Sequence, residues 1–197
     1  MENQTSRDTE LKLFMILLGS KAPGRHVEQH DYFFGIAPHL KDLVPEIKAF
    51  WLEAGEKIHI DAWREVNTVE GFKVTIQINS GQPAEEQHSR LFFINLGGYQ
   101  RNKFEEQHYP ILTVRDSMAE ASRTAKDTLF FKENHFEGAT SHIDDKYGVD
   151  VDDLYQIEDI LAPGQKAKYR IVLQPAEGLK EDEIHLGYLK LGSLVKL

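Results

Sequence analysis

Apolar positions in the first part of the chain come in short continuous runs. The run Leu13–Leu18 has no polar interruption and is closed by Gly19, a pattern typical of a strand buried on both faces. A second strand is predicted over Gln29–Ile36, where aromatic and branched residues gather. Two more apolar stretches, Lys57–Val66 and Phe72–Ile78, predict a third and a fourth strand.

The segment between the second and third strands has helical spacing instead. Apolar residues recur there at i, i+3, i+4 and i+7, which predicts an amphipathic helix. Pro45 has to lie in its first turns or mark a kink, because proline lacks the N–H that an inner turn needs. Gly55 is predicted to end the helix. The face expected to be buried includes Leu43, Ile47, Phe50 and Trp51.

The second half of the chain shows the same order of patterns. A helix is predicted to open at the capping box formed by Ser117 and Glu120, whose side chains can satisfy free N–H groups of a first turn. The strands around it are expected at Leu91–Leu96, at Tyr109–Val114, near His142 and at Tyr155–Ile157.

Residue identities repeat along with the patterns. The run Leu13–Gly19 returns as Leu91–Gly97, at an offset of 91 − 13 = 78 residues. The other two matches are Glu28–His30 with Glu106–His108, at the same offset, and His59–Asp61 with His142–Asp144, at an offset of 142 − 59 = 83. Three matches in the same order predict an internal duplication, whose copies are Leu13–Ile78 and Leu91–Leu161.

These patterns predict an α+β fold. It consists of two tandem ββαββ units, residues 11–78 and 91–161, with antiparallel sheets and a pseudo-two-fold relation. Residues 79–90 have the composition of a linker, and the polar residues 1–10 are expected to be disordered. Strand-like runs at Tyr169–Leu173 and Ile184–Leu189, within 162–197, are expected to add a hairpin to one unit or to cover an open sheet edge.

Three motifs carry a resemblance to a known family. They are the run 28–35 with its Glu-Gln-His-Asp and Phe-Phe-Gly, the run His59–Glu65, and the run Ser141–Asp150. Through them the chain, from Leu11 to Leu173, resembles the bacterial family called domain of unknown function 1543. The resemblance implies one or two copies of such a unit and implies no activity.

The repeated polar residues are the candidate site residues. In a strand, residues i and i+2 share a face, so each Glu-x-His or His-x-Asp pair points one way. A histidine beside a carboxylate suits Zn²⁺, Mn²⁺ or Fe²⁺, an organic ligand or partner, or a structural hydrogen bond. The pairs are Glu28 with His30, His59 with Asp61, Glu106 with His108, and His142 with Asp144, and Arg25 and Lys103 are added as equivalent cations that could each contact an anion.

Composition narrows the classes of function. The chain has no cysteine, which excludes disulfides, thiolate metal sites and a catalytic thiol. Its net charge of −9 makes nucleic acid an unexpected partner. No stretch approaches the ~20 apolar residues of a membrane span, and no signal peptide is evident, so we expect a cytoplasmic protein.

No motif names a reaction or a cofactor. The acidic run from Asp144 to Asp153 lacks the frame of a calcium loop and is expected to be a solvated loop. We expect a non-catalytic binding or interaction module for a small molecule or a protein partner, with a groove between the two repeats. The alternative is a metal-dependent enzyme, such as a hydrolase, that uses the histidine and carboxylate pairs.

Overall fold

A computed structural model describes residues 10–81, 87–99, 102–126 and 149–194. The chain divides into two compact units. The first contains residues 1–83 together with 161–197, and the second contains residues 84–160. The predicted C-terminal extension therefore forms part of the first unit, although the second unit stands between the two segments in the sequence.

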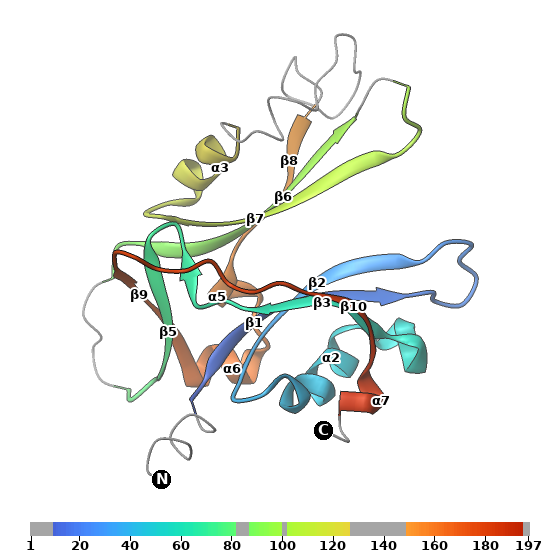
Figure 1. The fold of residues 1–197 in the computed structure, drawn as a ribbon, viewed down its shortest axis with the longest axis horizontal. Coiled ribbons are helices and arrows are strands. Elements are labelled where there is room, and N and C mark those ends of the chain that lie inside the picture. Colours follow the sequence, from blue (N-terminus) through green and yellow to red (C-terminus); the bar gives the residue numbers. More distant parts are fainter. Residues whose placement is uncertain (1–9, 82–86, 100–101, 127–148, 195–197) are drawn as a thin grey trace. The chain divides into compact units, whose positions relative to one another are not determined.

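The first unit is built on a four-stranded antiparallel sheet with the order β10-β3-β1-β2 (Figure 1). The buried run predicted at Leu13–Leu18 lies in the central strand β1, which explains why both of its faces are apolar. The strands are β1 (Lys12–Ser20), β2 (Gln29–Ala37), β3 (His59–Glu65) and β10 (His185–Lys190).

The predicted single helix is broken into three short segments. A 3-10 turn, Leu40–Leu43, precedes α2 (Val44–Phe50), and a second 3-10 segment, Leu52–Lys57, follows it. Pro45 stands in the first turn of α2, as predicted, because its missing N–H is not needed there. Gly55 has the left-handed φ of 56° inside the last segment and turns the chain toward β3.

This break decides which apolar residues are buried. Leu43 and Ile47 are buried, as predicted, and pack with Phe14, Ile16 and Ile60 in the main core. The prediction that Phe50 is buried is wrong, because the residue is 46% exposed, with its ring centroid 5.4 Å from that of Phe33. Trp51 is partly buried against the same core.

A second sheet of the first unit has the order β4-β5-β9 and is also antiparallel. The predicted C-terminal hairpin is wrong: β9 pairs with β5, whereas β10 pairs with β3 in the other sheet. The alternative expectation, that a C-terminal strand covers an open sheet edge, agrees with β10, which pairs with β3. The strands of this sheet are β4 (Thr68–Val69), β5 (Phe72–Ile78) and β9 (Tyr169–Pro175). The first unit also contains the short helices α6 (Pro163–Lys168) and α7 (Leu191–Leu194).

One residue of α6 closes the outer edge of the four-stranded sheet. The Gln165 side chain is buried, accepts a hydrogen bond from the Ile36 backbone N–H at 2.7 Å and donates one to the Ile36 carbonyl at 2.9 Å. It also donates to Glu46 at 2.5 Å. Strand β2 would otherwise leave these backbone groups of Ile36 without partners at a buried edge.

The second unit contains a three-stranded antiparallel sheet with the order β7-β6-β8, covered by a helix. Ala121 and Ala125 of the helix are fully buried against Phe92, Ile94 and Leu96. Its elements are β6 (Arg90–Tyr99), β7 (Glu106–Arg115), α3 (Met118–Lys126), β8 (Val149–Gln156) and α5 (Ile157–Ile160).

Two predictions about this unit need correction. Residues Val149–Gln156 form strand β8, so the later part of the acidic run is a paired strand and not a solvated loop. The strand predicted at Tyr155–Ile157 ends at Gln156, and Ile157 opens a helix. The predicted cap at Ser117 is present, because Ser117 Oγ accepts from the Glu120 N–H at 3.3 Å. Glu120 accepts from the N–H of Asp116 at 3.2 Å.

The coarse prediction of an α+β fold with antiparallel sheets is confirmed. No helix among the described residues is both long and apolar enough to cross a membrane.

Candidate functional site

The first candidate site, which we call the first cluster, is organised around a glycine in the central strand. Gly19 of β1 pairs with His30 on one side and with His59 on the other. Residues paired across neighbouring strands point to the same face, and so do residues two apart along a strand. His30 and His59 therefore lie on one face, where Asp61 of β3 and Glu28, the residue just before β2, approach them.

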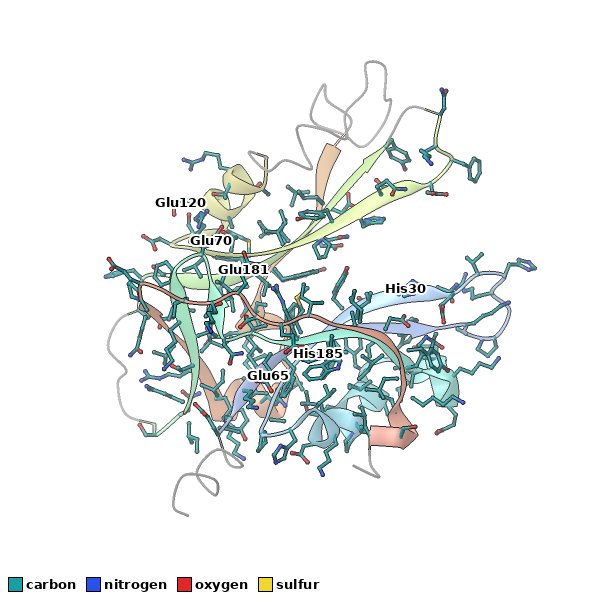
Figure 2. The ribbon with its side chains drawn as sticks, in the orientation of Figure 1. His30, Glu65, Glu70, Glu120, Glu181 and His185 are labelled. Carbon is teal, nitrogen blue, oxygen red and sulfur yellow. The ribbon has the colours of Figure 1, made fainter. Side chains whose placement is uncertain are left out.

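The four side chains of the first cluster alternate in kind around a closed ring. Glu28 lies 3.9 Å from His30 Nε2 through Oε2 and 3.0 Å from His59 Nε2 through Oε1. Asp61 closes the ring, with Oδ2 at 3.2 Å from His30 Nε2 and Oδ1 at 3.3 Å from His59 Nε2. Each histidine thus presents Nε2 to two carboxylates. Figure 2 shows where His30 stands on β2.

The other ring nitrogen of His59 is already engaged. Nδ1 lies 2.9 Å from the backbone oxygen of Lys57, which can only accept, so Nδ1 carries the proton of this hydrogen bond. In the neutral ring, Nε2 then holds a lone pair that faces two negatively charged groups. A ring nitrogen that faces two carboxylates in this way is an arrangement suited to holding a metal ion.

Gly19 leaves room for this ring. A Cβ at this position would overlap Asp61 Oδ2 and would lie 2.6 Å from His59 Nε2. Asp61 Oδ2 is itself buried and accepts no hydrogen bond from the described residues, although His30 Nε2 is 3.2 Å away. A buried carboxylate oxygen without a hydrogen bond is uncommon in folded proteins. The missing side chain of Gly19 is therefore part of the construction of the site.

The four side chains differ in exposure. His59 is buried, with 6% of its side chain exposed, whereas Glu28 and His30 are exposed to 43% and 46%. Solvent therefore reaches the cluster from the β2 side. The buried His59 has the tilted ring of Tyr188 at a centroid distance of 4.3 Å.

A cavity of about 750 Å³ opens beside the first cluster and lies wholly within the first unit. Glu28 and His59 line both the cavity and the cluster. The cavity lies where β1 and β10 end and β3 begins, so residues far apart in the sequence meet there. Other residues that line the cavity include Lys21, Lys57, Ile58, Tyr188, Lys190 and Leu191.

The second cluster lies in the second unit and is built on Gly97. This glycine of β6 pairs with His108 of β7 and with Asp150 of β8. His108 Nδ1 lies 3.3 Å from Asp152 Oδ2, and its Nε2 lies 4.0 Å from Glu106 Oε2. Ligand atoms of Glu106, His108 and Asp152 all lie within 4.8 Å of one another, a spacing that could hold a metal ion.

Three neighbours complete the second cluster. Asn95 Nδ2 lies 3.2 Å from His108 Nδ1 and 3.4 Å from Asp153 Oδ2. The charge of Glu106 raises the pKa of the Tyr99 phenol above its usual value, with smaller contributions from desolvation, from a hydrogen bond to Glu106 and from the charge of Asp152. Tyr99 therefore reports on the negative charge of the cluster.

The two expected residues His142 and Asp144 lie outside the described residues. At the strand positions that His59 and Asp61 hold beside Gly19, the second unit has Asp150 and Asp152 beside Gly97. The offset of 83 residues therefore does not describe the pairing of β6 with β8. The signal for Asp152 was present in the sequence, because Asp150 and Asp152 repeat the i, i+2 spacing.

The two predicted anion contacts stand apart from both clusters. Arg25 lies in the connection between β1 and β2, and Lys103 lies in the connection between β6 and β7. Both are exposed, and neither side chain makes a hydrogen bond or an ion pair with another described residue. The residues of the first connection that line the cavity are Lys21 and Glu28.

Comparison with known proteins finds a family model that matches part of the chain and a solved structure with a similar fold. The model of the family Domain of Unknown Function (DUF1543) matches residues 25–76, a region that holds all four side chains of the first cluster. A search among curated proteins finds no match to the chain. The fold is similar to the crystal structure of a protein Il1583 from Idiomarina loihiensis, with a TM-score of 0.62 and 19% identity. The likeness covers 92% of this chain and 98% of that one and concerns the fold alone.

Proposed function

We propose that the protein is a binding protein whose first cluster holds a divalent transition-metal ion. The observation that carries this proposal is the alternating ring of Glu28, His59, Asp61 and His30. Ligand atoms around a tetrahedral zinc ion with bonds of about 2.0–2.1 Å lie roughly 3.3 Å apart. Along the ring, the nitrogen–oxygen separations run from 3.0 to 3.9 Å, and Glu28 and Asp61 each turn one carboxylate oxygen toward each histidine. Imidazole with carboxylate suits Zn²⁺, Fe²⁺ or Mn²⁺.

The surroundings of His59 support the same proposal. Histidine ligands of metals usually donate the second ring N–H to a carbonyl or carboxylate, which fixes the tautomer and the orientation of the ring. The contact between His59 Nδ1 and the Lys57 oxygen provides this support from a buried position. Gly19 provides the space in which the carboxylate of Asp61 lies next to the histidine rings.

The test is a measurement of bound metal. Protein saturated with Zn²⁺ and freed of excess metal should retain about one tightly held ion, by elemental analysis and by titration calorimetry. The variants His30→Ala and His59→Ala should lose it. His88→Ala serves as the control, because His88 is exposed and belongs to neither cluster. A parent protein without stoichiometric metal, or equal losses in the control, would refute the proposal.

A metal-dependent hydrolase is the second candidate, and the cavity favours it. Glu28 and His59 border the cavity, so a ligand there would lie beside the proposed ion. An enzyme should release p-nitrophenol from p-nitrophenyl esters with saturation, and His59→Ala should abolish the release. A binding protein should show no such turnover with the metal in place.

We also infer that the two units arose by duplication. Gly19 of β1 pairs with His30 of β2, and Gly97 of β6 pairs with His108 of β7. Gly97 and His108 each lie 78 residues after their counterparts in the first unit. The pairing with the third strand shifts register at Leu17/Leu18 and again at Asn95/Leu96, at the same offset. An experimental structure in which these registers differ would argue against a common origin.

The remaining expectations about location and partners stay proposals. A chain without cysteine fits the reducing cytoplasm. With a net charge of −9 we expect no affinity for nucleic acid at about 150 mM salt. Binding of DNA that weakens steeply as salt is raised would contradict this expectation. Each cluster is assembled within one unit, so the proposed site needs no groove between repeats.

A further inference from the structure

The cavity beside the first cluster has a charge opposite to that of the whole chain. Four lysines line it, Lys21, Lys48, Lys57 and Lys190, in a protein whose net charge is −9. Lys48 is paired with Glu56 at 3.1 Å. The side chains of Lys21, Lys57 and Lys190 make no hydrogen bond or ion pair with any residue in the described part of the chain. Three uncompensated cations at one opening attract an anion.

Part of the wall of the cavity is apolar. Val44, Ile58 and Leu191 are buried core residues that also face the cavity, and the Tyr188 ring stands next to them. Apolar walls with a few convergent charged groups are typical of pockets for small organic molecules, whose volumes run from about 300 to 1,000 Å³. The cavity volume of about 750 Å³ falls within this range.

We propose that this cavity binds a small organic anion with a doubly charged oxyanion group, a phosphate monoester or a dicarboxylate, on an apolar body. Lys21, Lys57 and Lys190 hold the charged group, and Tyr188 contacts the body. The oxyanion also reaches the metal ion through the part of the cavity bordered by Glu28 and His59. Only this last contact rests on the proposed function, because the lysines and the tyrosine stand outside the first cluster.

The test uses phenyl phosphate as the probe, with phenol and inorganic phosphate for comparison. Titration calorimetry on the metal-free full chain should give one phenyl phosphate per chain and no binding of phenol. The double variant Lys57→Gln/Lys190→Gln should bind about tenfold more weakly or worse, because bonds to charged groups are the strong ones. Lys73→Gln, an exposed lysine of β5 outside the cavity, is the matched control and should bind as the parent does.

A second variant separates the body of the ligand from its charge. Tyr188→Ala should weaken phenyl phosphate and leave inorganic phosphate unchanged, since inorganic phosphate has no apolar body. Equal binding of phenol and phenyl phosphate, or an unchanged affinity in the double lysine variant, would overturn the inference. Loading the protein with Zn²⁺ should tighten phenyl phosphate binding, and no change would overturn the contact with the metal.

The two proposals fail in different ways. Lysine-dependent binding of phenyl phosphate by a protein that takes up no metal would sustain the organic-anion site and refute the metal site. Stoichiometric zinc that depends on His59, without any binding of phenyl phosphate, would do the reverse.

Discussion

The two clusters share one backbone design and differ in the side chains placed on it. Each lies on a glycine of a central strand, with a Glu-x-His pair on one neighbouring strand. The other neighbour contributes His59 and Asp61 in the first unit and Asp152 in the second, where the backbone position that corresponds to His59 is residue 150. The first cluster also contains a buried ring, whereas the side chains of Glu106, His108 and Asp152 are 28–48% exposed.

This difference teaches how one strand can change the chemistry of a site. Replacing a histidine by aspartate at one position shifts the ligands from nitrogen toward oxygen, which harder cations such as Mg²⁺ and Mn²⁺ prefer. It also removes the carbonyl-anchored ring that makes the first cluster rigid. We therefore expect the first cluster to bind zinc more tightly than the second.

The largest expected effect separates the cores of the two units. Ile47→Asp in the first unit should cost about 3–5 kcal/mol, because it leaves an unpaired buried charge. Both tryptophans, Trp51 and Trp63, pack against this core, so their emission should shift to the red. The corresponding change in the second unit, Ile94→Asp, should reduce the circular dichroism signal and leave tryptophan emission unchanged.

Unchanged thermal unfolding of Ile47→Asp would show that this helix face is not part of the core. Ile47→Val is the mild control, with an expected loss of about 0.5–1.5 kcal/mol.

The next effect distinguishes two histidines within the first cluster. His59→Ala should abolish zinc binding and also lower stability by roughly 1–3 kcal/mol, because the buried ring is lost and the Lys57 carbonyl loses its partner. His30→Ala should lose zinc with little change in stability, since its side chain is 46% exposed. Melting temperature and zinc content, measured together, test the pair. Two variants that lose stability equally would place His30 in a structural role.

The two glycines should respond differently to a methyl group. Gly19→Ala forces the methyl group against Asp61 and the buried His59 ring, and overpacking of this kind costs about 1–3 kcal/mol. In Gly97→Ala the three atoms nearest to the methyl group all belong to Asp152, which is 28% exposed and can turn aside, so the loss should be smaller. Chemical denaturation measures both differences.

Gly164→Ala is the control for these variants. No heavy atom lies within 4 Å of a Cβ at Gly164, and its φ is not left-handed, so alanine should leave stability unchanged or raise it. A larger loss at Gly97 than at Gly19 would contradict the packing described for the two clusters.

A gain of function would sharpen the comparison further. Position 150 pairs with Gly97 as His59 pairs with Gly19, so Asp150→His should make the second cluster resemble the first. Its zinc affinity should rise by about tenfold, or roughly 1.4 kcal/mol. Calorimetry in the His59→Ala background isolates this second site. An unchanged affinity would mean that strand register alone does not set the metal preference.

The smallest effect is a titration in the second unit. Glu106 raises the pKa of the Tyr99 phenol in the folded protein. The phenol therefore contributes to stability below the ordinary tyrosine pKa of about 10, and this contribution is lost as the pH rises through the raised value. Glu106→Gln should return the pKa toward normal. Tyrosinate absorbance, with Tyr99→Phe subtracted, measures it. A Tyr99 pKa that stays equally high in Glu106→Gln would contradict the assigned cause.

The sequence predicted most of the strands that the structure describes, and the two-residue spacing within the first cluster, because both depend on short-range periodicity. Alternation along β2 and β3 was enough to place Glu28 with His30 and His59 with Asp61 on common faces. It could not place the partners in space: the role of Gly19 and the closed ring depend on which strands pair. The lysine-lined cavity depends on β10, whose partner strand lies more than a hundred residues earlier.

The errors have physical causes as well. The helix starts anew at Val44, with Pro45 in its first turn, and it ends at Trp51, whose φ of −126° and ψ of 73° are not helical, and Phe50 is exposed despite its helical spacing. His142–Asp144 was matched to His59–Asp61 by residue identity alone, and residue identity does not determine which residues pair across the strands. Gln165 was missed because a single glutamine in a short helix gives no pattern that points to Ile36.

The placement of β9 and β10 has a consequence for the order in which the protein folds during synthesis. Strands β6, β7 and β8 leave the ribosome before β9 and β10, so every strand described in the second unit is available first. The first unit can complete neither of its sheets until its last segment, residues 161–197, has been made. Until then His59 lies on an edge strand without its β10 partner, and the cavity lacks Tyr188 and Lys190. The binding site of the first half of the chain is therefore the last part of the protein to be finished.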